Sequence, residues 1–131
     1  MKKSHFQLKE QPKILKLNFD GNPNYKNKKS TSLELEIDTK FEKNDELQEA
    51  VVFLHIKIND KELNEKIPFY LEAMITGSFV WKNESDEIIN NFLEANAPSI
   101  LLSFMRPVIS NIITYAGYPP YLIPFLDLRK N

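Results

Sequence analysis

The fold is decided by the stretch Asn96–Leu128, which reads NAPSILLSFMRPVISNIITYAGYPPYLIPFLDL. Pro98 can open a helix, because the first helical position tolerates proline. Over residues 100–116 the apolar side chains recur at helical spacing as a wide stripe, and Gly117 is a natural cap for the helix end. Pro107 cannot donate a backbone hydrogen bond inside this helix, so we expect a kink there. An apolar tail rich in proline follows.

The residues before this stretch alternate between apolar and polar side chains, which is the pattern of β-strands. The alternating runs are 5–19, 33–37, 51–58 and 67–79. Pro12 breaks the first run, which favours an edge or bulged strand. Residues 42–46 are expected to form a charged turn, and Gly77 in the longest run indicates a bulge or a close approach of another backbone. The acidic face of the second run is typical of an antiparallel sheet with one solvated face.

A shorter helix is expected between the last strand and the long one. Cap residues at 83–85, with Asp86 and Glu87 behind them, predict its start, and Asn96 and Pro98 are expected to end or restart it. The whole pattern predicts an α+β fold: a four-stranded antiparallel sheet meander with a long, kinked helix packed on one face. At 131 residues the chain fits a single domain, 1–131.

The composition excludes several classes of protein. The net charge is -1, from 17 basic and 18 acidic side chains, which does not favour nucleic acid or an anionic membrane as a partner. Cysteine is absent, which suits a reducing cytoplasm and removes disulfide scaffolds. The N-terminal residues do not form the apolar block of a signal peptide. The run 100–116 is interrupted by Arg106 and is short for a membrane span, so we expect a cytoplasmic protein without membrane insertion.

The residues that usually carry catalysis are not arranged for it. His5 and His55 are far apart in sequence and lack spaced acidic partners, so we expect no metal site. The serines of the long helix have no glycine elbow, and three glycines cannot build a phosphate-binding loop. We therefore expect no enzymatic activity and no cofactor. A segment this apolar acts by contact with other proteins.

One family shares the order of these elements and several of their residues. The shared residues are Phe69–Phe79 with Gly77-Ser78-Phe79 at the strand end, then Asn96, Pro98, Ile100, Leu101, Arg106, Ile109, Gly117, Pro119 and Pro124. In their order and spacing, over nearly the whole chain, they resemble the SecB family of export chaperones. The resemblance implies a homotetramer, a dimer of dimers whose long helices meet at the centre. It also implies binding of unfolded chains without ATP and their delivery to the SecA motor.

The resemblance also assigns surfaces. Tyr70, Glu72 and Asp20 match positions that the family turns toward SecA, whereas Lys16 stands where the family carries an acid. The C-terminal helix of the family is expected to be shortened or absent here, together with its SecA-contacting tail. Such a shortened chain also resembles the divergent members that protect an antitoxin in toxin-antitoxin systems.

Two sets of residues are expected to make the contacts. The client-binding set is Phe79, Trp81, Tyr118, Tyr121, Ile123, Phe125 and Leu128. Each of its members could equally belong to the core, where aromatic side chains are commonly found. The expected oligomer interface is Ile100, Phe104, Arg106, Val108 and Ile112, in which the arginine either reaches water or pairs across the interface.

Three functions remain open at this point. The first is an ATP-independent chaperone, or holdase, for unfolded or non-native polypeptides, with SecA as a further partner. The second is a chaperone of the same fold dedicated to one antitoxin. The third, of a different class, is a small-ligand-binding α+β domain with an enclosed pocket between sheet and helix.

Overall fold

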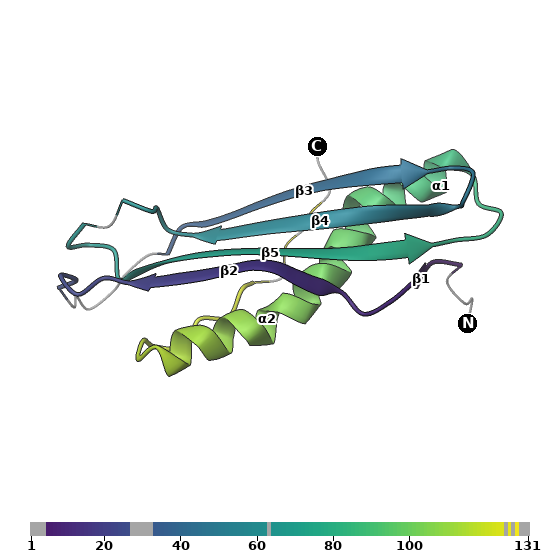
Figure 1. The fold of residues 1–131 in the computed structure, drawn as a ribbon. Coiled ribbons are helices and arrows are strands. Elements are labelled where there is room, and N and C mark those ends of the chain that lie inside the picture. The colour runs from purple at the N-terminus through teal and green to yellow at the C-terminus, as the bar shows by residue number, and fades with distance from the viewer. Residues whose placement is uncertain (1–4, 27–32, 63, 125, 127, 129–131) are drawn as a thin grey trace.

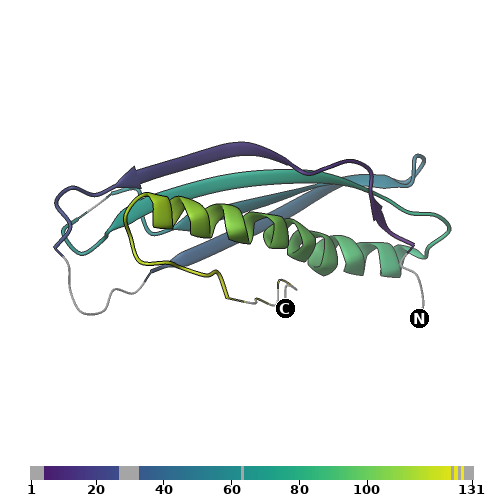
Figure 2. The same cartoon turned by 90° about the horizontal axis from the view of Figure 1, so that it is seen from below.

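A computed structural model describes residues 5–26, 33–62, 64–124, 126 and 128. In chain order its elements are β1 (Gln7–Leu8), β2 (Lys13–Gly21), β3 (Leu35–Asn44), β4 (Glu49–Ile58), β5 (Phe69–Val80), α1 (Asp86–Asn91), η1 (Phe92–Asn96) and α2 (Ala97–Tyr115). The strands form one antiparallel sheet, and the helical run crosses a single face of it (Figure 1, Figure 2). This two-layer arrangement confirms the predicted α+β class.

The first strand lies at the edge of the sheet in two pieces. The strand order is β1-β5-β4-β3, and β2 also pairs with β5. β1 pairs with the last two residues of β5 and β2 with Phe69–Thr76, so both belong to the one strand that Pro12 was expected to break. The sheet departs from a simple meander, which holds only for β3, β4 and β5. Because the first strand pairs with β5 and not with β3, the order is that of a Greek key.

The hairpin formed by β3 and β4 is longer than its charge pattern suggests. β3 continues to Asn44, and Glu42 and Lys43 pair with Val51 and Ala50 of β4. The charged turn predicted at 42–46 is therefore wrong in its first half, and the chain reverses over residues 45–48. An edge strand with one solvated face accommodates charged side chains, so their presence did not mark a turn.

The helical segment is continuous from Asp86 to Tyr115. Ser85 caps its start by accepting a hydrogen bond from the Ile88 amide. Of the two alternatives expected at Asn96, an end or a restart, the structure shows the restart: the wide turn η1 ends there and α2 begins at Ala97, which donates five residues back to the Phe92 carbonyl. Pro98, which has no amide hydrogen, follows directly after this turn.

The end of the helix matches its glycine signal. α2 continues through Pro107, and the Ser103 hydroxyl donates to the Ile100 carbonyl at 2.6 Å. Gly117 has a φ of +97°, and the Tyr118 amide reaches back to the Ile113 carbonyl at 3.2 Å. This left-handed C-cap confirms the predicted role of Gly117. The described residues beyond it form a turn and a tail without helical structure.

The helical run is long and apolar enough to span a membrane by length and composition alone. A helix that forms the core of a soluble domain passes the same test. Here the buried side chains of α2, among them Leu101, Met105 and Ile109, pack against the sheet.

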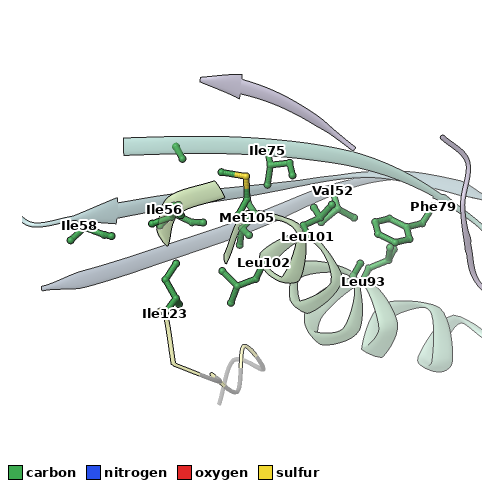
Figure 3. Packing of buried hydrophobic residues seen from close by; sticks show 14 of the residues in the cluster. Val52, Ile56, Ile58, Ile75, Phe79, Leu93, Leu101, Leu102, Met105 and Ile123 are labelled. Atoms are coloured by element: carbon green, nitrogen blue, oxygen red, sulfur yellow. The ribbon is translucent and has the colours of Figure 1, made fainter. Parts of the chain in front are cut away.

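The core lies between the sheet and α2. Figure 3 shows Val52, Ile56 and Ile75 of the sheet facing Leu101, Leu102 and Met105 of the helix. Gly77 permits the closest approach, since a Cβ atom there would lie 2.8 Å from Leu101 Cδ2 and 3.4 Å from Leu8 Cδ2. Its close neighbours are thus side chains rather than a second backbone. The third functional alternative, a small-ligand-binding domain, expected a pocket between the sheet and the helix. Apolar side chains of the core occupy that layer.

Candidate client-binding site

The residues predicted to bind clients do not form one surface. Phe79 lies near the end of β5, where β1 pairs with it, whereas Tyr118 contacts Phe69 at the start of β5. Ten residues of strand separate these two ends, which is about 33 Å at the rise of a β-strand. The structure therefore divides the predicted set into two groups, one at each end of the sheet.

Three of the predicted residues belong to the core. Phe79 is 1% exposed, Trp81 4% and Ile123 4%, so for these three the core alternative holds and they present no side-chain surface to a client in this structure. Phe79 and Trp81 continue the helix-facing side of β5, and Figure 3 shows Ile123 beneath Ile56 and near Leu102. Tyr118, Tyr121 and Leu128 are half-buried against the same core, and burial raises the pKa of the Tyr121 phenol. Phe125 lies outside the described residues.

A first aromatic cluster closes the β1 end of the sheet. It consists of Phe6, Phe79, Trp81 and Phe92. The Phe6 ring stacks on Phe92 with centroids 4.0 Å apart, and lies 6.0 Å from the Trp81 ring. The Phe92 ring in turn meets Phe79 edge-on at 5.5 Å. Sequence reasoning missed Phe6 and Phe92, although the alternation of Phe6 and Leu8 already indicated that both side chains point inward.

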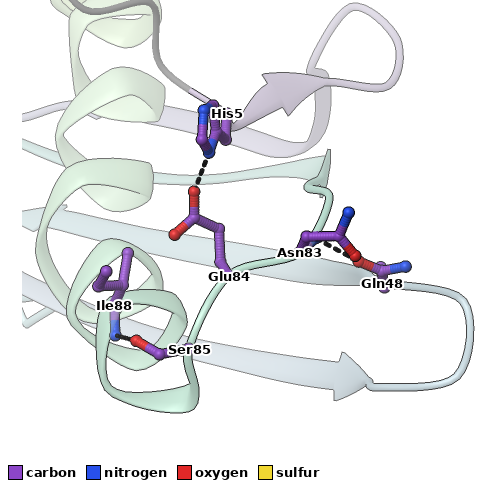
Figure 4. Close-up of polar contacts among 6 residues, drawn as sticks. All are labelled: His5, Gln48, Asn83, Glu84, Ser85 and Ile88. Atoms are coloured by element: carbon purple, nitrogen blue, oxygen red, sulfur yellow. Dashed lines mark hydrogen bonds and ion pairs between the residues drawn. The ribbon is translucent and has the colours of Figure 1, made fainter.

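Polar contacts fix the backbone around Trp81 in this cluster. The Trp81 amide donates to the Gln48 carbonyl at 3.1 Å, and the Asn83 amide donates to Gln48 Oε1 at 2.9 Å. Figure 4 shows the Asn83 contact together with the His5–Glu84 pair, which ties the N-terminal segment to the start of the helical run. The backbone around Trp81 is therefore held by Gln48, whereas the N-terminal segment is held by its own contact with Glu84.

A second aromatic cluster closes the other end of the sheet. It consists of Phe19, Phe69 and Tyr118, whose ring centroids lie 5.2 to 5.9 Å apart. Gly21 leaves room for it, since a Cβ atom there would lie 3.0 Å from the Tyr118 hydroxyl oxygen. This cluster fixes the first residue of the tail against the sheet.

The tail is held at its backbone while some of its side chains face water. Arg106 Nη2 donates to the Pro124 carbonyl at 2.8 Å, and Ile123 next to it lies in the core. Leu122 nevertheless remains 75% exposed, and Tyr115 at the end of α2 is 86% exposed. Fixed backbone with exposed apolar side chains is typical of a contact surface.

The predicted SecA-facing residues lie on the open face of the sheet, where Glu72 is the centre of a polar cluster. Glu72 accepts from Lys16 Nζ at 3.0 Å, from His55 Nε2 at 2.6 Å and from the Tyr70 hydroxyl at 3.0 Å. The hydrogen bonds from Lys16 and His55 lower the pKa of Glu72 to about 2. Burial and the nearby Glu72 carboxylate raise the pKa of Tyr70. Asp20 is exposed, whereas Tyr70 is buried.

A polar hollow of about 380 Å³ opens beside this cluster. It is lined by Glu34, Glu36, Lys57, Asn59, Asp60, Lys61, Tyr70 and Glu72. Its lining is charged and it lies on the open face, so it differs from the enclosed apolar pocket of a small-ligand-binding domain.

The expected oligomer residues fall on two sides of α2. Phe104 is exposed, and Ile100, Val108 and Ile112 are partly buried. Arg106 is turned about 200° around the helix axis from Phe104 and holds the tail instead. Exposed Ile14, Leu15 and Leu17 follow the edge strand β2, and Leu17 pairs with Ala73 on the helix-covered face of the sheet. An apolar edge therefore adjoins the apolar flank of the helix.

Comparisons with known proteins identify one family model that matches nearly the whole chain and relatives that match about two thirds of it. The model of the family "Preprotein translocase subunit SecB" matches residues 3–130. The protein-export protein SecB of Burkholderia vietnamiensis is 34% identical over 90 residues, which are 68% of this chain and 55% of that protein. SecB of Anaplasma phagocytophilum is 33% identical over 82 residues, 60% of this chain and 52% of that protein. The aligned part of the chain thus spans little more than half the length of these two relatives.

The solved structures include one of the same fold. The SecB-like chaperone Rv1957 of Mycobacterium tuberculosis, in complex with a ChAD peptide from the Rv1956 HigA1 antitoxin, superposes with a TM-score of 0.73 at 13% identity. The superposition covers 94% of this chain and 91% of that one. Because the family model matches the chain almost from end to end and the folds agree, this protein belongs to the SecB family.

Proposed function

We propose that this protein is an ATP-independent chaperone of the cytoplasm that holds unfolded or non-native polypeptides, with no enzymatic step. The observation that carries the proposal is the tail: its backbone is fixed by Arg106 and Ile123, while Leu122 and Tyr115 offer apolar area to solvent. Contact with such a surface is non-directional, so it tolerates many client sequences. Membership of the SecB family supports the same function.

Clients are proposed to lie along this tail. Of the predicted client-binding residues, Tyr118, Tyr121 and Leu128 are half-buried there and still present part of their side chains. Leu122 is added to them, and Phe125 stays a prediction because it lies outside the described residues. Phe79 and Trp81 are assigned to a separate site, argued in the next subsection.

A homo-oligomer fits the apolar edge. An edge strand with exposed Ile14, Leu15 and Leu17 is a template for pairing with another chain, and the adjoining flank of α2 carries Phe104. A second copy of the protein that covers this edge would remove these apolar side chains from water. We propose a dimer through this edge as the unit from which a dimer of dimers is built.

Contact with SecA receives less support from the open face. The carboxylate of Glu72 is paired with the ammonium group of Lys16, and Tyr70 is buried, which leaves Asp20 as the exposed member of the predicted set. A purely acidic docking surface is therefore not formed. The geometry favours client holding that does not depend on the motor.

A chaperone dedicated to an antitoxin is the second candidate. It is supported by the match to Rv1957, which was solved with a peptide from an antitoxin. The two candidates differ in client range, because a dedicated chaperone binds one partner and a holdase binds many.

The test is suppression of aggregation. The purified protein, at stoichiometric amounts and without nucleotide, is mixed with several unrelated, chemically unfolded proteins, and light scattering is followed. The holdase proposal expects suppression with all of them, and a clear loss in the double variant Tyr115→Ser, Leu122→Ser. Leu47→Ser is the matched control, since Leu47 is an exposed leucine in the β3–β4 turn, away from the tail. Suppression of one client alone would favour the dedicated chaperone, and no suppression at all would overturn the holdase.

A further inference from the structure

We propose that β1 is a displaceable strap, and that the aromatic groove beneath it is a second client site, filled by an extended segment with basic flanks. The groove is formed by Phe79, Trp81 and Phe92, and the strap is residues 5–9. This inference rests on the proposed chaperone function and assigns a further site to it.

The strap is attached by few contacts. β1 has two residues, Gln7 and Leu8, and the Lys9 amide adds a hydrogen bond to the Ser78 carbonyl at 2.8 Å. Its ion pairs, His5 with Glu84 and Lys9 Nζ with Glu49 Oε2 at 3.1 Å, join exposed basic side chains to half-buried acids. Pairs of this kind contribute little to stability. Pro12 separates the strap from β2, so the strap can leave while β2 stays paired.

The walls of the groove do not depend on the strap. β5 is paired on its other side with β4 as far as Val80, which lies opposite Glu49. Trp81 is anchored by its amide to the Gln48 carbonyl, and Phe92 belongs to the helical run. Removal of the strap therefore leaves a free strand edge beside three aromatic rings, all of which keep their own support.

The strap itself indicates the chemistry of the occupant. It is an extended segment in which Phe6 and Leu8, two residues apart, point inward onto Phe92 and toward Gly77. A client with an aromatic and an aliphatic residue at this spacing can add to the same edge of β5 by backbone hydrogen bonds. Glu84 and Glu49, which now pair with His5 and Lys9, would then meet basic residues on either side of the client's apolar pair.

A disulfide lock tests the strap. Gln7 and Val80 are cross-strand partners on the open face, and the chain has no cysteine of its own. Antiparallel partners lie about 4.5–5.5 Å apart at Cα, within the range of a disulfide, so Gln7→Cys with Val80→Cys can be closed by oxidation. The matched control is Glu42→Cys with Val51→Cys, which closes the same kind of bond between β3 and β4.

The probe is the peptide dansyl-Phe-Gln-Leu-Lys-Phe-Gln-Leu-Lys, which repeats residues 6–9 and contains no tryptophan. Trp81 is the one tryptophan of the chain, so energy transfer to the dansyl group reports binding on the part of the protein near Trp81, and the disulfide lock tests whether that binding lies under the strap. Two further peptides replace either both phenylalanines by alanine or both lysines by glutamate. They separate the aromatic requirement from the charge requirement.

The proposal expects at least tenfold weaker binding by the oxidised lock, recovery on reduction, and no change in the control disulfide. It also expects weaker binding of both altered peptides, and tighter binding of the original peptide by Phe6→Ala, which loosens the strap. Equal affinity of the locked and reduced forms, or binding without energy transfer from Trp81, would overturn the strap while leaving the aggregation assay to decide the chaperone function. Loss of aggregation suppression in the wild-type protein would overturn the chaperone function by itself, because the peptide assay does not use aggregation.

Discussion

The two ends of the sheet carry similar aromatic clusters that are closed in different ways. At the β1 end, Phe6 covers Trp81 and Phe92 from a segment attached by two paired residues. At the other end, Tyr118 covers Phe69 from a tail that Arg106 and Ile123 hold over several residues. The comparison teaches that equal aromatic packing does not mean equal attachment. We propose that the cover of the first end, residues 5–9, can be displaced, whereas the tail at the second end presents side chains on a fixed backbone.

The largest expected effect is the loss of a buried ring. Phe79→Ala and Phe69→Ala each remove a fully buried aromatic side chain, so each should lower the free energy of unfolding by about 3–5 kcal/mol. Chemical denaturation monitored by far-UV circular dichroism measures this. Similar losses at both ends would show that the two clusters contribute equally to the free energy of unfolding. A much smaller loss in Phe79→Ala would mean that the first end is already loosely packed.

Glu72 lies on the open face of the sheet, outside both aromatic clusters, so a substitution there tests the sheet without disturbing either cluster. Its folded pKa of about 2 lies below the ordinary value of 4.5, so its contribution is full above about pH 4.5 and is lost as the pH falls toward 2. The side chain is 14% exposed, and after a discount for solvent screening the contribution is about 2 kcal/mol. Glu72→Gln should remove it at neutral pH.

The measurement is the urea midpoint of wild type and Glu72→Gln at pH 7, 4 and 2.5. The two proteins should differ most at pH 7 and converge at pH 2.5. Glu36→Gln is the control, since Glu36 is an exposed glutamate on the same face. A difference that is constant with pH would contradict the assignment of the low pKa to the Lys16 and His55 contacts.

Phe6→Ala and Phe19→Ala compare the covers of the two clusters directly. Both rings are half-buried and both stack on an aromatic neighbour, so each substitution should cost about 1–2 kcal/mol, less than a fully buried ring. Only Phe6→Ala should shift the emission of Trp81 to longer wavelength, because Phe6 lies against it. An equal shift in Phe19→Ala would show that the two ends are coupled through the sheet.

Much of this architecture could be predicted from the sequence. The period of two located the strands, and the cap residue Ser85 and Gly117 located the ends of the helical run, because these signals depend on neighbouring residues alone. Pro12 was correctly expected to break the first strand. What the pattern could not give was the partner of that strand, since pairing with β5 rather than β3 depends on a connection of many residues.

The site was harder to predict for a physical reason. Hydrophobicity identifies the residues that avoid water, but it does not say whether core, a second copy or a client covers them. For Phe79 and Trp81 the sequence therefore left client contact and core both open, and the structure places them in the core. Leu122 and Ile123 are neighbours of similar character, and only the packing beneath Ile56 separates the buried one from the exposed one. Lys16, a departure from the family pattern, proved to be the partner of Glu72.

The smallest expected effect is at Arg106, and it sharpens the comparison most. Arg106→Met keeps a long apolar side chain but removes the hydrogen bond to the Pro124 carbonyl, which should cost about 1 kcal/mol. Hydrogen exchange should become faster in the tail, while the emission of Trp81 stays unchanged. Lys82→Met, beside the first cluster, is the control and should leave the tail protected. If Arg106→Met instead released the β1 end, the two ends would form one cooperative unit, and the strap could not open independently of the tail.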